Sequence, residues 1–191
     1  MTKFLTVLVS FLLLTLPLTS TALADEYSAA TKVFKEAKAS KALFKNCYGY
    51  AIFPTIGKGG FGIGGAHGGG RVYEQGVYVG DATMTQITVG FQAGGQAFTQ
   101  IIFFQNKDSF NEFTTGEFEF GAQATAVAIT AGAQASTSTA GSSAGAGASS
   151  SRAKNFGRYS NGMATFTVAK GGLMYEASIG GQKFRYKAKK K

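Results

Sequence analysis

The sequence has little of the chemistry that most enzymes and metal proteins use. It contains no tryptophan, one cysteine, one histidine and two prolines in 191 residues. Cys47 alone cannot form an intramolecular disulfide. His67 has no second histidine or nearby cysteine with which to bind zinc, and it could activate the Cys47 thiol only if the fold brought the two together. We therefore expect a protein that is not an enzyme and that has no metal site and no cofactor.

Negative charge is also scarce. The chain has 10 acidic residues against 19 lysines and arginines, for a formal net charge of +9. The spacing of the acidic residues matches neither a calcium loop nor a glycosidase pair. An excess of positive charge favours anionic partners such as phospholipid head groups, nucleic acid or acidic polymers.

The N-terminus is predicted to be a secretory signal peptide over residues 1–24. One lysine, Lys3, precedes an apolar run from 4 to about 18, and small residues follow, ending in A-L-A at 22–24. The run is short for a membrane span and contains Pro17, so cleavage before Asp25 is expected rather than retention as an anchor. Residues 25–191 would then form a single exported domain, periplasmic or secreted, and the short signal favours a prokaryotic envelope.

Residues 26–46 predict a basic amphipathic helix. Ala30, Val33, Phe34 and Ala37 follow the i, i+3, i+4, i+7 spacing of an apolar face. Lysines at 32, 35, 38 and 41 lie on the opposite face, and the helix could break near Ser40. Such a helix can lie on an anionic membrane, or it can pack its apolar face on the body of the domain, and the two roles are compatible.

From Tyr48 onward the apolar period changes from helical to two, which predicts strands. They are expected at 48–53, closed by Pro54, and at 71–73, 77–79, 85–91, 98–104, 163–169, 173–179 and 182–186. The apolar end of the strand at 98–104 predicts burial on both faces. The fold class is therefore α+β, mainly β: an antiparallel β-barrel or sandwich with an N-terminal amphipathic helix and one short connector helix.

That connector helix is expected between residues 106 and 115. Ser109 and Glu112 have the spacing of a capping box, and Gly116 would end the helix. Phe110 and Phe113 would lie on one side of it.

Glycine dominates the stretch GKGGFGIGGAHGGGRVY at 57–73. It contains a formal G-x-G-x-x-G match, but no helix can follow in such a run, so a dinucleotide site is not expected. Glycines at 60, 62 and 64 would give a strand one face of bare backbone that another element or a ligand can approach closely. The triplet at 68–70 is expected to turn the chain, which predicts a packing hairpin over 57–71.

Two further segments have distinctive compositions. Residues 131–151 are almost entirely Gly, Ala, Ser and Thr, which predicts a mobile low-complexity loop. In the last strand, basic residues at 183, 185 and 187 alternate with Phe184 and Tyr186, which predicts a basic edge on an aromatic base, followed by a lysine tail at 187–191. Glu117 and Glu119 share one strand face, which is expected to be solvated.

The order of motifs resembles the SYLF domain. The resemblance is carried by AIFPTIGKGGFGIGGAHGGGRVY (51–73), VGDATMTQITVGFQAGGQAFTQIIFF (79–104) and GGLMYEASIGGQKF (171–184), and it covers most of residues 25–191. It implies binding to membrane phospholipid, with phosphoinositides in the eukaryotic members, some of which also bind actin. Family members bind lipid partly through a basic amphipathic N-terminal segment, which residues 32–45 match in character. Export would separate this chain from cytoplasmic actin, so actin is not an expected partner.

The function predicted from the sequence is non-enzymatic binding of phospholipid by peripheral docking on an anionic membrane. The residues expected to contact head groups are the basic residues of the helix and the strand edges: Lys32, Lys35, Lys38, Lys41, Lys45, Lys58, Arg71, Lys183, Arg185 and Lys187. The alternative is a structural or interaction protein of the cell envelope that binds acidic polymers or other proteins. An integral outer-membrane barrel is opposed by the basic helix, the polar insert and the lysine tail, and nucleic-acid binding lacks any recognition motif.

Overall fold

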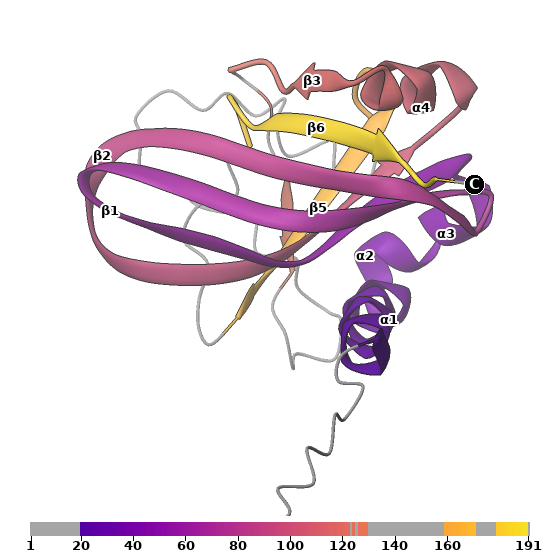
Figure 1. The fold of residues 1–191 in the computed structure, drawn as a ribbon, viewed down its shortest axis with the longest axis horizontal. Helices are drawn as coiled ribbons and strands as arrows, with labels where there is room; N and C mark the ends of the chain where they lie inside the picture. Colours follow the sequence, from indigo (N-terminus) through magenta and orange to yellow (C-terminus); the bar gives the residue numbers. More distant parts are fainter. Residues whose placement is uncertain (1–19, 123, 125, 130–158, 171–178, 191) are drawn as a thin grey trace, which may run out of the picture.

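The computed structural model describes residues 20–122, 124, 126–129, 159–170 and 179–190 (Figure 1). The described elements, in chain order, are α1 (Ser20–Glu36), α2 (Lys38–Lys41), α3 (Leu43–Asn46), β1 (Gly49–Glu74), β2 (Val77–Phe104), α4 (Lys107–Thr114), β3 (Glu117–Glu119), β4 (Val127–Ile129), β5 (Met163–Lys170) and β6 (Lys183–Ala188). The low-complexity segment at 131–151, most of the predicted signal peptide and most of the strand expected at 173–179 lie outside the described residues.

One long antiparallel hairpin, β1 and β2, forms the centre of the sheet. Its pairing runs from Gly49 opposite Phe104 to Glu74 opposite Val77. The turn residues Gln75 and Gly76 have φ angles of 48° and 82°, as the type I′ turn of a two-residue hairpin requires. The strands expected at 48–53, 71–73, 77–79, 85–91 and 98–104 are therefore segments of only two strands.

Two of the expected strand ends were wrong. The glycines at 68–70 do not turn the chain, because they lie within β1 and pair with residues 82–84 of β2. The hairpin expected over 57–71 is therefore absent from this segment, and the turn comes at Gln75 and Gly76 instead. Pro54 does not close the first strand either. It lies within β1 where the register shifts between Phe53 and Ile56, and such an irregularity accommodates a residue that has no N–H.

The hairpin folds back over itself at its glycine-rich middle. The register shifts between Gly60 and Gly62, and Figure 1 shows both strands turning back at this end. The second half of β1 then lies against the first half. A Cβ on Gly68 would lie 2.7 Å from the Thr55 carbonyl oxygen, and one on Gly70 would lie 2.5 Å from the Phe53 ring. The close approach therefore occurs at two glycines that were expected to form a turn, and the approach expected at glycines 60, 62 and 64 stays a prediction.

The two halves of β2 pair with different strands along the edge that does not pair with β1. The described strands follow the order β3-β6-β2-β5-β4, and β1 pairs with the other edge of β2. β6 pairs with residues 80–85 of β2 and β5 with residues 97–104. β4 and β5 run parallel, so the sheet is mixed. The mainly β fold is confirmed, but the antiparallel barrel or sandwich was wrong, because the described sheet is open. β2 is long enough that the β6–β3 pair and the β5–β4 pair join it at different parts of its length.

Apolar side chains form two clusters on opposite faces of the sheet. The first cluster comprises Ala51, Phe53, Ile56, Ala66, Val72, Ala82, Met84, Phe98, Ile102, Phe104, Phe110, Phe113, Phe120, Met163, Ile179 and Phe184. The second comprises Ala30, Phe34, Leu43, Ile52, Ile101, Phe103, Ala164, Phe166 and Val168. Since alternate residues of β2 enter different clusters, the predicted burial of 98–104 on both faces is confirmed.

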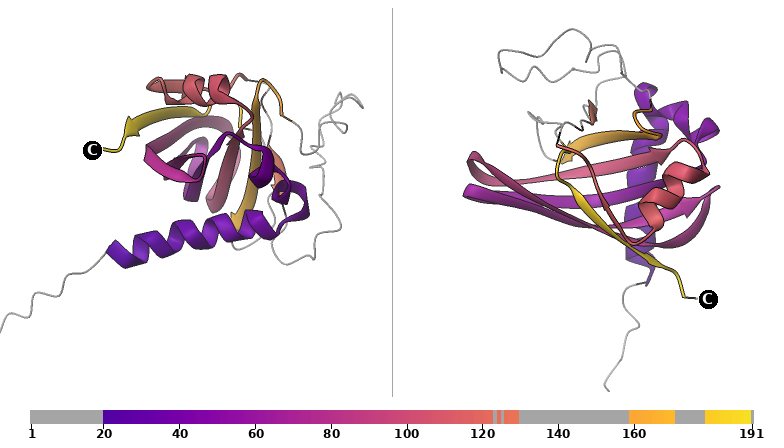
Figure 2. Two further views of the ribbon diagram at one scale, coloured as in Figure 1. Left: turned by 90° about the vertical axis from the view of Figure 1, so that its right-hand side faces the viewer. Right: turned by 90° about the horizontal axis from the view of Figure 1, so that it is seen from above.

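The predicted N-terminal helix packs on the body of the domain. Phe34 of α1 is completely buried in the second cluster, and Ala30 lies beside it. The helical region is divided into three pieces, with breaks at Ala37 and Ala42 rather than near Ser40. Ser40 is buried, and its hydroxyl donates a hydrogen bond to the Phe34 carbonyl at 2.7 Å, which joins α2 to the end of α1. α1 runs along one side of the sheet and α4 lies on the other (Figure 2).

The short helix α4 forms as predicted but with a different cap. Asn106 is the N-cap: its side chain accepts a hydrogen bond from the Ser109 N–H at 3.0 Å, and Ser109 completes the capping box. The box expected from Ser109 and Glu112 was therefore wrong by one turn, because an asparagine side chain can cap as well as a serine. Phe110 and Phe113 are both buried in the first cluster, so α4 is part of the core as well as a connector.

A buried pair of glutamines joins β2 to the segment before β6. Gln100 and Gln182 are almost completely buried, and their amides exchange hydrogen bonds of 2.8 and 3.2 Å. We expect Gln100→Leu to lower the free energy of unfolding by about 2 kcal/mol, since it leaves the Gln182 amide buried without its partner. The double variant Gln100→Leu/Gln182→Leu should recover most of this loss.

Urea denaturation measures both changes. Gln105→Leu, which replaces an exposed glutamine of the next segment, serves as the control and should change stability little. A double variant that is less stable than Gln100→Leu alone would show that the amide pair is not the cause.

Candidate functional site

The ten basic residues proposed from the sequence do not form one patch. Five lie on α1 to α3, two on β1 and three on β6. The helical residues are Lys32, Lys35, Lys38, Lys41 and Lys45; the strand residues are Lys58, Arg71, Lys183, Arg185 and Lys187. Their charges must be considered with their neighbours, because a cation that already faces a carboxylate contributes less to an anionic ligand.

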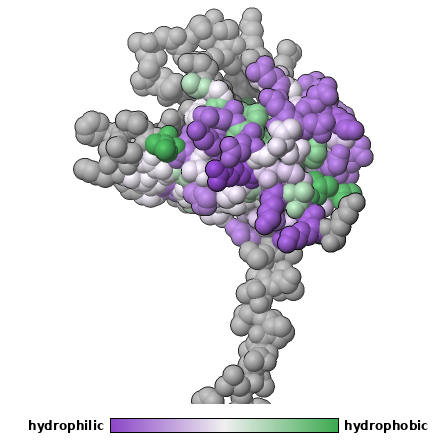
Figure 3. All heavy atoms as spheres, turned by 45° about the horizontal axis from the view of Figure 1, so that its top comes forward, coloured by the Kyte–Doolittle hydropathy of each residue, from purple (hydrophilic) through white to green (hydrophobic). Residues whose placement is uncertain are grey.

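The basic edge of β6 is balanced by β3. Arg185 lies 3.0 Å from Glu117, and Lys183 lies 3.5 Å from Glu119. The predicted alternation is confirmed, since both cations are exposed while Phe184 between them is buried. The charge is not in excess there, because the two glutamates expected on a solvated face are the ion-pair partners. Hydrophilic side chains predominate on the side of the molecule that carries α4 and β6 (Figure 3).

Two cations of α1 are also engaged. Lys32 lies 3.9 Å from Glu36 on the same helix face, and such exposed i, i+4 pairs contribute a few tenths of a kcal/mol. Lys35 lies over the Phe44 ring, 5.6 Å from its centroid. The exposed face of α1 is therefore nearly balanced in charge.

Arg71 connects the hairpin to α1. Its guanidinium carbon lies 4.2 Å from the Tyr27 ring centroid and 5.2 Å from that of Tyr78. The Tyr78 hydroxyl donates a hydrogen bond of 2.8 Å to Asp81, and burial together with this bond raises the pKa of Tyr78 to about 12. We call Tyr27, Arg71 and Tyr78 the tyrosine–arginine stack. It holds the beginning of α1 against the hairpin.

Removing Arg71 should loosen α1 without unfolding the domain. Of its two cation–π contacts, only the one with Tyr27 joins the hairpin to α1, and at about 0.5 kcal/mol it predicts that Arg71→Ala lets the amides of residues 26–36 exchange hydrogen roughly twofold faster. Hydrogen exchange measured by mass spectrometry should show this change in α1 and none in β5. Arg185→Ala removes an exposed arginine far from α1 and serves as the control. Equal exchange in α1 of the wild type and Arg71→Ala would contradict this role.

The excess positive charge of the helical region lies on α2 and α3. Lys38, Lys41 and Lys45 are exposed, and residues 37–47 contain no aspartate or glutamate. Within the described part of the chain none of the three has an ion-pair partner. We call them the α2–α3 lysines.

The helical segment that carries the α2–α3 lysines packs against the second cluster. Leu43 is buried in the second cluster. The Phe44 ring meets Phe103 edge-on at 4.8 Å and Tyr50 at 5.5 Å between centroids. The three ammonium groups are thus presented by a fixed surface rather than by a loose segment.

Cys47 and His67, the two residues considered for catalysis, each contact neighbouring residues of the fold. Cys47 packs against the second cluster, and burial raises the pKa of its thiol, the opposite of what activates a nucleophile. His67 is exposed on β1, and its Nδ1 lies 3.3 Å from the Thr85 hydroxyl. Across the described ranges, no three His, Cys, Asp or Glu side chains gather where they could hold a metal ion. Among the same residues, no helix is long and apolar enough to cross a membrane.

Comparison with protein families shows the family to which this chain belongs. Residues 85–190, more than half of the sequence, match the family described as Ysc84: Las17-binding protein actin regulator. The chain belongs to the Ysc84 family. This confirms the resemblance to the SYLF domain, which is the same family, and the family is one of non-catalytic binding domains. A search of curated proteins gives no match.

The Ysc84 match has a definite position on the fold. It begins at Thr85, in the first third of β2, and includes α4 and β3 to β6. The buried glutamine pair and Phe184 therefore lie within the matched region. The α2–α3 lysines and Arg71 precede it, so their role has to be argued from this chain's own geometry.

Proposed function

We propose that this Ysc84-family domain binds anionic phospholipid membranes peripherally and without catalysis, using the α2–α3 lysines to contact head groups. The observation that carries the proposal is that Lys38, Lys41 and Lys45 are exposed on a packed base in a segment without acidic residues. A lysine close to a charged bilayer contributes about 1 kcal/mol. Three such residues give about 3 kcal/mol, or roughly a hundredfold in affinity at low salt.

The docked position of α1 limits how lipid can be bound. Ala30 and Phe34 of the predicted apolar face are buried against the sheet, whereas Val33 is exposed. While α1 stays docked, Ala30 and Phe34 are not available to acyl chains. We therefore expect the interaction to be mainly electrostatic and to weaken as salt screens it.

The proposal includes an extracytoplasmic location. Residues 1–24 have the pattern of a signal peptide, so the domain would act in the periplasm or after secretion, at a membrane surface. The family description names actin regulation and Las17. Export would keep this chain away from cytoplasmic actin, and for that reason we favour lipid as the partner.

Co-sedimentation with vesicles tests the proposed function. Protein purified from cells expressing the full sequence is mixed with phosphatidylcholine vesicles, with or without added phosphatidylglycerol, at low and high salt. Binding that requires the anionic lipid and decreases at high salt is the expected result. No binding to either vesicle would overturn the lipid proposal and favour an acidic polymer or protein of the envelope, or actin, each of which can be tested by the same sedimentation.

A further inference from the structure

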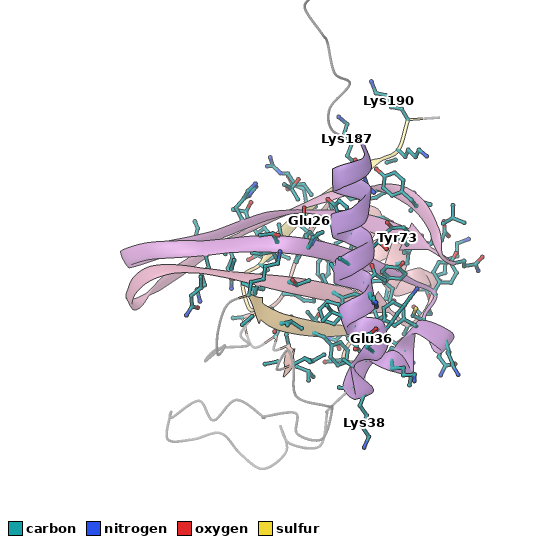
Figure 4. All side chains as sticks on the ribbon, turned by 90° about the horizontal axis from the view of Figure 1, so that it is seen from below. Glu26, Glu36, Lys38, Tyr73, Lys187 and Lys190 are labelled. Atoms are coloured by element: carbon teal, nitrogen blue, oxygen red, sulfur yellow. The ribbon has the colours of Figure 1, made fainter. Side chains whose placement is uncertain are left out.

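We propose that the domain touches the bilayer at both ends of α1, and that the second contact is made by the C-terminal lysines Lys187, Lys189 and Lys190. In the view of Figure 4, Lys187 and Lys190 lie toward the end of the molecule at which α1 begins, and Lys38 lies toward the opposite end. The inference rests on the proposed function, because it adds a second contact with the same anionic surface.

The C-terminal lysines are held in place by the sheet. Lys187 lies in β6 opposite Asp81 of β2, and the Lys189 N–H donates a hydrogen bond of 2.8 Å to the Val79 carbonyl. The Tyr186 hydroxyl donates to the same carbonyl at 3.0 Å. What the sequence suggested as a tail is thus anchored to β2 as far as Lys189, while the three lysine side chains remain exposed.

The tyrosine–arginine stack connects these lysines to α1. The Lys189 ammonium lies 5.2 Å from the Tyr78 ring centroid, and Arg71 lies at the same distance from that ring. Tyr27 of α1 completes the series. Half-buried tyrosines beside basic side chains suit the head-group layer, where an amphipathic ring contacts both apolar and polar groups.

The charge at this end is positive. Arg71, Lys187, Lys189 and Lys190 lie near the carboxylate of Asp81, which is opposite both Arg71 and Lys187 in the sheet, and Glu74 acts electrostatically on the neighbouring Tyr186. Four cations against these two anions leave an excess of two. Both ends of α1 are therefore complementary to an anionic bilayer.

The helix between the two ends can approach a flat surface. Once residues 1–24 are removed as proposed, 12 residues of α1 remain, from Asp25 to Glu36, and at about 1.5 Å per residue they separate the ends by about 18 Å. Glu26 accepts a hydrogen bond from Thr55 at 2.6 Å and pairs with Lys170, while Glu36 pairs with Lys32. Since both glutamates are engaged and Ala29 is exposed between them, the outer face of α1 adds little repulsion. The domain would dock with α1 parallel to the bilayer.

Labels on opposite sides of the sheet test this orientation. Ala29→Cys places a thiol on the outer face of α1 and Asn111→Cys places one on α4, each in a Cys47→Ala background so that a single thiol carries an environment-sensitive fluorophore. With phosphatidylglycerol-containing vesicles, the label at position 29 should become at least threefold less accessible to acrylamide. The label at position 111 should not change.

Charge removal tests the second contact. Lys187→Gln/Lys189→Gln/Lys190→Gln is expected to weaken vesicle binding about tenfold and to restore acrylamide access at position 29. The control Lys107→Gln/Lys183→Gln/Arg185→Gln removes the same charge from exposed positions on α4 and β6, away from α1, and should bind within about twofold of the wild type. Thermal melts identify any variant that fails to fold.

The outcomes separate the two proposals. Vesicle binding with position 29 fully accessible, or equal losses for the C-terminal variant and its control, would overturn docking through both ends while leaving the α2–α3 contact standing. Absence of vesicle binding by the wild type would overturn the proposed function and this inference together.

Discussion

Replacing Gly70 with alanine is expected to lower the free energy of unfolding by about 3 kcal/mol, the upper range for overpacking a close contact. The added Cβ would lie 2.5 Å from the Phe53 ring and 2.9 Å from the Ile52 carbonyl oxygen. The ring can rotate, but the carbonyl belongs to the first half of β1, so the two halves of the strand would have to separate. For a chain of this size the loss corresponds to about 6–12 °C in Tm. Gly68→Ala should have a similar effect, because its Cβ would meet the Thr55 carbonyl at 2.7 Å.

The glycine between these two provides the matched control. A Cβ on Gly69 would have no atom within 4 Å, so Gly69→Ala should leave Tm within about 2 °C of the wild type. Thermal unfolding followed by circular dichroism measures all three variants. Equal Tm values for Gly69→Ala and Gly70→Ala would mean that the folded-back hairpin is not held as closely as described.

Truncating Phe184 is expected to have the largest effect of any single substitution. Its ring is 1% exposed and lies within 6.2 Å, centroid to centroid, of the rings of four other phenylalanines. These are Phe53, Phe113, Phe118 and Phe120. Because they come from β1, α4, β3 and the segment after β3, Phe184→Ala should lower the free energy of unfolding by about 4 kcal/mol through lost burial and a cavity.

Two comparisons separate a cavity from a general effect of substitution. Phe184→Leu keeps most of the volume and should cost about half as much. Val77→Ala changes a side chain that is 65% exposed and should cost little. Denaturant titration gives all three values, and a Phe184→Ala loss no larger than that of Val77→Ala would contradict the described core.

Local sequence patterns correctly predicted which faces of several helices and strands are buried. The spacing of Ala30 and Phe34 identified the apolar side of α1, and the apolar run at 101–104 identified the strand segment buried on both faces. The alternation of Lys183 and Phe184 placed the two faces of β6 correctly. In each case the periodicity of the side chains is decided by the local backbone, so sequence alone was sufficient.

The path of the hairpin could not be predicted in the same way. Glycine permits both a turn and a strand that another strand approaches, so the run at 68–70 was interpreted as a turn. The choice between the two depends on Thr55 and Phe53, which lie far from these glycines in sequence. The actual turn, Gln75-Gly76, lacks the Asn-Gly or Asp-Gly pair that most strongly signals a two-residue hairpin.

The candidate site changed because charge partners are set by tertiary structure. The pairing of β3 with β6 places Glu117 beside Arg185, and neither residue has a local signal for the other. Tyr27 and Tyr78 were missed for the same reason, since only the folded-back hairpin brings Arg71 between them. The absence of acidic residues from 37–47 was visible in the sequence and was the one signal that could have singled out the α2–α3 lysines.

The most direct measurement compares two variants that remove the same charge. Lys38→Gln/Lys41→Gln/Lys45→Gln is set against the control Lys107→Gln/Lys183→Gln/Arg185→Gln, with affinity for phosphatidylglycerol-containing vesicles measured at low salt. We predict a loss of roughly a hundredfold for the α2–α3 variant and less than twofold for the control. Equal losses in the two variants, or none in either, would contradict the claim that the α2–α3 lysines bind the membrane.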